Sequence, residues 1–89
     1  FDFTSGYLFD EIIGEFPRFT LGERARAEDF YRRFFAAGKE ILKQEGRMIL
    51  LSGEEGEIKK HLRLCKELRL LRQIPFRKRE KIYIIERRA

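Results

Sequence analysis

The pattern of apolar positions predicts alternating strands and helices. Residues 7–14 are aromatic and β-branched at their ends and close on a glycine, which indicates a strand. From Arg24 to Gln44 apolar residues recur at steps of three and four while charged residues take the other face, which predicts a helix. Gly46 stands where a glycine commonly ends such a helix. The first half of the chain is therefore expected to contain one strand and one long helix.

The second half continues the alternation. Residues 48–51 form a wholly apolar run, typical of a strand covered on both faces. A second helix is predicted over 54–68, where an apolar stripe follows three glutamates in the first turn. The runs 70–76 and 81–86 look like strands, and the short basic turn between them predicts an antiparallel hairpin.

The resulting order is strand, helix, strand, helix, strand, strand. Right-handed crossovers would make the first three strands parallel and place the last strand antiparallel among them. We therefore expect an α/β fold in which helices flank a mixed, mostly parallel sheet in three layers, with a C-terminal antiparallel hairpin. The 89 residues contain no linker or internal repeat, so we expect a single domain over 1–89.

Composition excludes several classes of protein. Cys65 and His61 are the single cysteine and the single histidine, so the chain can form neither an internal disulfide nor a four-ligand zinc site. We expect Cys65 to be a small buried residue, His61 to be a solvated or lightly capped histidine and not a catalyst, and no metal to be bound. Neither a phosphate-binding glycine motif nor a nucleophile with base and orienting partner is present, which argues against a self-contained hydrolase.

The sequence also bears on where the protein works. It contains no apolar run near the roughly 18 residues of a membrane span and no basic-then-apolar leader, so we expect a soluble, cytoplasmic protein without a membrane partner. The one methionine is Met48, which leads us to expect further chain upstream of Phe1.

Positive charge is concentrated at the C-terminal end. The net charge is +5, and residues 69–89 hold eight basic and two acidic residues, so this segment carries all of the excess. Such a cluster can hold phosphate backbones with a salt-dependent affinity. Alternatively, it keeps an exposed hairpin soluble and blocks pairing at its edge. The charge alone does not choose between the two interpretations.

The loop after the first strand contains a second group of candidate residues. Ligands of open α/β sheets bind at the carboxyl ends of parallel strands. The first strand is followed by the carboxylate of Glu15, the aromatic rings of Phe16 and Phe19, and the cation of Arg18. These groups could accept hydrogen bonds from a base, stack on it and contact a phosphate. The alternative is a strand-to-helix turn in which both rings fold back onto the core.

The order and spacing of these segments resemble the C-terminal half of Rossmann-fold S-adenosylmethionine-dependent RNA methyltransferases, namely the THUMP-associated and UPF0020-like guanine-N2 methylases. The matching segments are Phe9-Asp10-Glu11-Ile12-Ile13 for the fourth strand, residues 29–35 and 39–43 for the next helix, residues 46–51 for the fifth strand, and 74–76 with 81–86 for the final hairpin.

The resemblance implies that the chain is the C-terminal half of a methyltransferase catalytic domain. The glycine-rich cofactor loop of this family lies on its first strand, which this chain does not contain. We therefore expect S-adenosylmethionine in the full-length parent, no cofactor-binding residue here, and no activity from this chain alone. The expected partners are RNA, as tRNA or rRNA, and the missing N-terminal part of the same domain.

In this family an Asn/Asp-Pro-Pro-Tyr/Phe motif follows the fourth strand, holds the target amino group and stacks on the flipped-out base. Here Glu15 stands at the Asn/Asp position, Pro17 matches one proline, Phe16 fills or precedes the other, and Phe19 follows one residue after the fourth position. The resemblance thus implies a catalytic set of Glu15, Phe16, Pro17 and Phe19 and an RNA-binding set of Arg18, Arg77, Lys78, Arg79 and Lys81. The rival hypothesis is a non-catalytic nucleic-acid-binding or interaction domain that uses the same basic hairpin.

Overall fold

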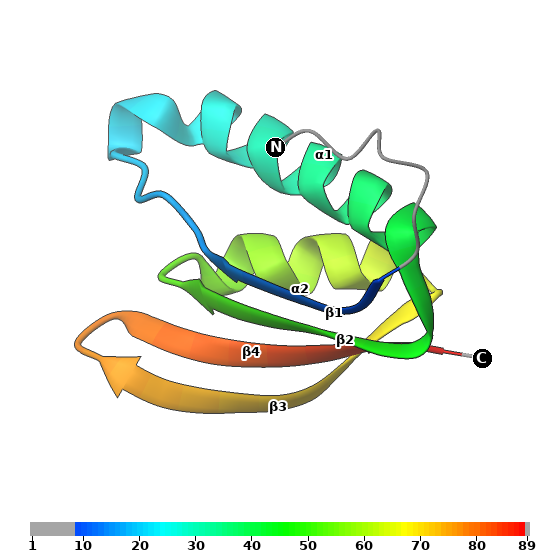
Figure 1. The fold of residues 1–89 in the computed structure, drawn as a ribbon. Helices are drawn as coiled ribbons and strands as arrows, with labels where there is room; N and C mark the ends of the chain where they lie inside the picture. The colour runs from blue at the N-terminus through cyan, green and yellow to red at the C-terminus, as the bar shows by residue number, and fades with distance from the viewer. Residues whose placement is uncertain (1–8, 89) are drawn as a thin grey trace.

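The computed structural model describes residues 9–88, which fold into one sheet and two long helices (Figure 1). In chain order the elements are β1 (Phe9–Glu15), the short 3-10 helix η1 (Leu21–Glu23), α1 (Arg24–Ile41), β2 (Leu42–Ser52), α2 (Glu55–Leu64), β3 (Leu68–Arg77) and β4 (Glu80–Arg87). The predicted first strand is confirmed from Phe9 onward, and its expected beginning at Tyr7 and Leu8 lies outside the described residues.

The four strands lie in the order β1-β2-β4-β3. β1 pairs with β2 in parallel, and β4 pairs antiparallel with both β2 and β3. Three strands therefore run the same way, and the last strand of the sequence lies among them. This arrangement confirms the predicted α/β class, the mixed sheet and the C-terminal hairpin.

The start of β2 differs from the prediction. α1 ends at Ile41 and β2 begins at once with Leu42, so Gly46 lies inside a strand and does not follow a helix. The register shifts between the pairs Phe9–Leu42 and Glu11–Arg47, and Glu45 has a positive φ of 65°. A Cβ on Gly46 would lie 2.8 Å from the carbonyl oxygen of Lys43 and 3.0 Å from that of Asp10, so glycine avoids a clash within β2 and a tight contact with β1.

Both helices pack on the same face of the sheet (Figure 1). α1 is amphipathic, and its buried positions recur at helical spacing: Ala27, Tyr31, Phe34, Phe35, Gly38 and Ile41. Its rings meet Met48 and Leu50 of β2, Ile58 of α2, and Tyr83 and Ile85 of β4 in one core.

The expectation of three layers is wrong for residues 9–88, which form two. Both crossovers, from β1 to β2 and from β2 to β3, step in the same direction across the sheet. Right-handed connections that step in the same direction place their helices on the same face. The opposite face carries Ile13, Ile49, Leu51, Ile74, Ile82 and Ile84, which we call the open sheet face. Ile13 is 71% exposed there, and the others are partly buried.

Two further findings concern membrane-spanning helices and clusters of metal-binding side chains. None of the helices in the described part of the chain is long and apolar enough to cross a membrane. Between residues 9 and 88, no group of three or more histidine, cysteine or acidic side chains could hold a metal ion.

Candidate nucleic-acid interface

The carboxyl ends of β1, β2 and β3 meet at one edge of the sheet because these strands run in the same direction. A hollow of about 700 Å³ lies at this edge, and we call it the edge hollow. Its walls are the loop at residues 17–21, Arg24 at the start of α1, the turn at residues 53–54, and the hairpin turn at residues 77–80. The fold thus brings together two segments that are about 60 residues apart in sequence.

Most of the predicted site residues lie around this hollow. Pro17, Arg18 and Phe19 line it from the first loop, and Arg77, Lys78 and Arg79 line it from the hairpin turn. Glu15 ends β1 beside them, with a side chain that is 70% exposed. Its Oε1 atom lies 3.7 Å from Nη2 of Arg77, so this carboxylate and the basic turn are neighbours.

Phe16 has a different place. It is 3% exposed and packs edge-to-face against Phe30, Tyr31 and Phe34, with ring centroids 5.3, 5.1 and 4.6 Å away. Its backbone N–H donates to the carbonyl oxygen of Leu51 at 2.9 Å. The assignment of Phe16 to base stacking is therefore corrected in favour of the alternative, in which the ring belongs to the core.

Phe19 is intermediate between core and surface. Its ring is partly buried and lies tilted against Phe30, 5.8 Å between centroids, while the residue also lines the edge hollow. Among the predicted aromatic candidates, Phe19 is thus the one with access to a ligand in the hollow.

A buried carboxylate joins the two basic segments. Glu80 is 6% exposed, and its Oε1 atom accepts a hydrogen bond from Nη2 of Arg18 at 2.8 Å and lies 3.1 Å from Nε of Arg77. The Arg18 side chain is 77% exposed, so the pair itself adds little stability. Glu80 instead holds the first loop against the hairpin turn. The sequence does not reveal this role, because an acidic residue within a basic turn gives no sign of a partner 62 residues away.

Lys81 does not line the edge hollow. Its ammonium bonds to the carboxylate of Glu55 in α2, and this hydrogen bond is the main reason that the pKa of Glu55 lies below its usual value. Lys81 therefore ties the hairpin to α2, whereas the three basic residues before Glu80 face the hollow.

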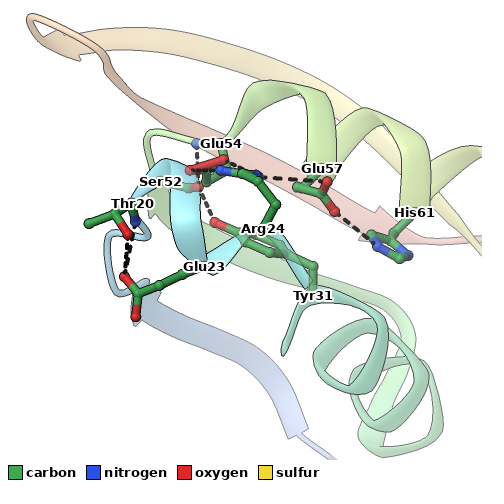
Figure 2. A network of polar contacts seen from close by, with 8 residues as sticks. All are labelled: Thr20, Glu23, Arg24, Tyr31, Ser52, Glu54, Glu57 and His61. Atoms are coloured by element: carbon green, nitrogen blue, oxygen red, sulfur yellow. Dashed lines mark hydrogen bonds and ion pairs between the residues drawn. The ribbon is translucent and has the colours of Figure 1, made fainter. Parts of the chain in front are cut away.

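Polar contacts fix the wall formed by the two helices (Figure 2). Arg24 donates from Nη1 and Nη2 to the two carboxylate oxygens of Glu54, at 3.0 and 2.8 Å, and this bonding raises the pKa of Arg24. The Tyr31 hydroxyl bonds to Ser52 Oγ at 2.5 Å, and Ser52 Oγ also accepts the N–H of Glu54 at 3.0 Å. Burial raises the pKa of Tyr31, so this phenol stays neutral.

The same network continues inward to His61 (Figure 2). Glu57 Oε1 lies 3.8 Å from Nη2 of Arg24, and Glu57 Oε2 lies 3.4 Å from Nε2 of His61. His61 is 4% exposed and stacks on Phe35, so the expectation of a solvated histidine is wrong. Cys65 is partly buried and packs against the core, close to what its pattern predicts.

No protein-family model matches the sequence, and no curated protein matches it either. Solved structures do match. A candidate DNA modification methylase from Thermus thermophilus aligns with 98% of this chain and 50% of its own, at a TM-score of 0.71 and 14% identity. The chain has the fold of part of a methyltransferase.

A second structure agrees. A methyltransferase from Pyrococcus furiosus aligns with 93% of this chain and 42% of its own, at a TM-score of 0.63 and 14% identity. The chain thus spans about half the length of these structures or less. The likeness confirms the predicted methyltransferase-like fold, and at this identity it carries no information on the substrate.

Proposed function

We propose that this chain is the C-terminal part of the catalytic domain of an S-adenosylmethionine-dependent methyltransferase acting on RNA, with an exocyclic amino group of guanine-N2 type as acceptor. The observation that carries the proposal is the edge hollow. The loop that resembles the family motif and the basic hairpin turn both line it. A base could therefore contact the loop while the neighbouring phosphates contact the hairpin turn.

Each residue at the hollow has a distinct proposed role. The exposed carboxylate of Glu15 accepts hydrogen bonds from the amino group, and Phe19 offers a ring face within a loop that Pro17 stiffens. Lys78 and Arg79 contact phosphates; neither forms an ion pair with another residue of the described chain. Phe16 contributes only packing beneath the loop.

Arg18 and Arg77 differ from these two cations because Glu80 already engages both. A phosphate that enters the hollow meets guanidinium groups that the fold has positioned beforehand, which lowers the ordering cost of binding. Lys81, bonded to Glu55, has an indirect part in this proposal: it fixes the hairpin.

A cradle for S-adenosylmethionine in this fold uses a glycine-rich turn between a strand and a helix, where missing side chains leave room for the ligand. Within residues 9–88, the space beside Gly38 is filled by the Met48 side chain, and the space beside Gly46 is filled by Leu42 and the Asp10 carbonyl. The more open Gly14, Gly22 and Gly56 are far apart in sequence and form no glycine-rich turn. We propose that the cofactor is held by the remainder of the parent domain, which also packs on the open sheet face.

The test is methyl transfer from labelled S-adenosylmethionine to RNA and to DNA by the whole protein. We expect transfer to RNA, and we expect Glu15→Ala to lower kcat about 100-fold, as removal of one transition-state hydrogen-bond partner commonly does. Glu11→Ala is the matched control. Glu11 is an exposed glutamate on the same strand, roughly 13 Å away at about 3.3 Å per residue, and its loss should leave turnover unchanged.

Each other outcome of this experiment has a definite interpretation. Unchanged turnover in Glu15→Ala removes Glu15 from the mechanism, and transfer to DNA alone refutes the choice of RNA. Salt-dependent nucleic-acid binding without any methyl transfer supports the rival hypothesis of a non-catalytic binding domain.

A further inference from the structure

A second basic surface lies at the end of the sheet opposite the edge hollow. It is built where α2 ends, β3 begins and β4 ends, and its cations are Arg63, Lys66, Arg69 and Arg88, which we call the far basic patch. These four residues line one shallow depression of about 440 Å³, and no carboxylate contributes to its lining. The edge hollow, by contrast, includes Glu54 and Glu80 among its lining residues.

The cations of the far basic patch are mostly uncompensated. Within residues 9–88, the side chains of Arg63, Lys66 and Arg88 form no ion pair, and all three residues are exposed. Arg69 alone has a partner, Glu86, at 2.9 Å. Cations without internal partners remain available to an external anion, and four in one depression raise the local positive potential.

The depression also has a defined shape. Its floor is apolar and consists of Leu62, Leu68 and Leu70, all packed on or within the core. The backbone N–H of Arg88 donates to the carbonyl oxygen of Glu67 at 2.7 Å, which fixes the backbone of Arg88 at the rim. An apolar floor can contact bases and a cationic rim can contact phosphates, so the depression suits nucleic acid.

The spacing links this patch to the edge hollow. β3 is one of the two edge strands of the sheet, and it runs from the far basic patch, at Arg69, to the hollow, at Arg77. Eight residue steps of about 3.3 Å give roughly 26 Å. Stacked nucleotides advance about 3.4 Å each, so about eight of them span the distance. Arg72, exposed and without an ion pair in the described chain, lies between the two ends.

We propose that the far basic patch is a second phosphate-contacting surface, and that nucleic acid held at the edge hollow runs along β3 to reach it. The proposal rests on the proposed function, because it takes the same nucleic acid as the ligand. It adds a surface some eight nucleotides from the reacting base, which would favour substrates with a long single strand over short ones.

The experiment measures the affinity of the whole protein for single-stranded RNA of 5 and 15 nucleotides over a series of salt concentrations. The test variant is Arg63→Gln/Lys66→Gln/Arg88→Gln. The control is Arg26→Gln/Arg32→Gln/Arg33→Gln, which removes the same charge from the solvent face of α1. We expect the 15-mer to bind the test variant about tenfold more weakly and with a salt slope lower by up to about 2, since each lost contact with a single strand removes about 0.7.

The length dependence provides a second readout. Only the 15-mer reaches both surfaces, so its advantage over the 5-mer should disappear in the test variant and persist in the control. If the test variant unfolds at a lower temperature, the single change Lys66→Glu replaces it. Lys66 is exposed and forms no ion pair within residues 9–88, so this change should not disturb the fold.

Several results would overturn the inference. One is a test variant that keeps the 15-mer affinity and salt slope of the control while Glu15→Ala still lowers kcat; the proposed function then stands without the second surface. Another is a test variant that loses binding to anionic lipid vesicles or to an acidic peptide while its RNA binding stays intact. Absence of any nucleic-acid binding by the unmodified protein overturns both proposals together.

Discussion

Two glycine-to-alanine changes should have opposite effects on stability. In Gly46→Ala the new methyl group would lie 2.8 Å from both Leu42 Cδ1 and the carbonyl oxygen of Lys43, and 3.0 Å from that of Asp10. The Lys43 oxygen belongs to β2 and the Asp10 oxygen to β1, so the backbone of β2 must distort and β1 must give way. Such overpacking costs about 1–3 kcal/mol. In Gly56→Ala, in the first turn of α2, the methyl group meets nothing within 4 Å.

The second change should therefore stabilise the protein by about 0.4–1 kcal/mol, because alanine restricts the unfolded chain and favours the helix. For a domain of this size each kcal/mol moves the melting temperature by about 4–8 °C. Thermal and urea unfolding of the two variants beside the unmodified protein check both signs. Equal melting temperatures, or a more stable Gly46→Ala, would refute the reasoning that Gly46 is required by close approach of two strands.

Two further predictions concern buried tyrosines. Tyr31→Phe removes the hydroxyl bonded to Ser52 and should cost about 1 kcal/mol in urea unfolding, with methyl transfer retained; a cost near zero would mean that the bond is not formed. Burial raises the pKa of Tyr83 to about 12 from an ordinary value of 10. The unfolded state then loses this proton first, so stability should fall as pH rises from about 10 to about 12. In Tyr83→Phe that fall should be smaller, and an unchanged pH profile would contradict the assignment.

The sequence predicts the order of elements well because each segment carries its own periodicity. The helical spacing of Tyr31, Phe34 and Phe35 and the apolar run at residues 48–51 are local signals. The start of β2 was missed because its cause is tertiary. Gly46 looks like a helix terminator in sequence, and only the approach of Asp10 shows that it serves a strand.

The candidate site was predictable in part for the same reason. Ligand sites of open sheets lie at strand ends, so the loop after β1 and the basic turn could be picked out one at a time. Whether an aromatic residue in such a loop is buried depends on the helix that packs over the loop. Phe16 is buried because its ring packs against Phe34 of α1. Contacts such as Arg18 with Glu80 and Arg24 with Glu54 join distant residues, and no local pattern encodes them.

The position of β4 has a consequence for biosynthesis. This strand is made after the other three strands of residues 9–88, yet it lies between β2 and β3, and β3 pairs with no other strand in this range. While the ribosome still covers residues 80–87, β3 lacks the strand with which it pairs. Only β1 and β2 can then form a sheet. A message cut short before Glu80 would yield a product with two bare strand edges, a species prone to self-association and degradation.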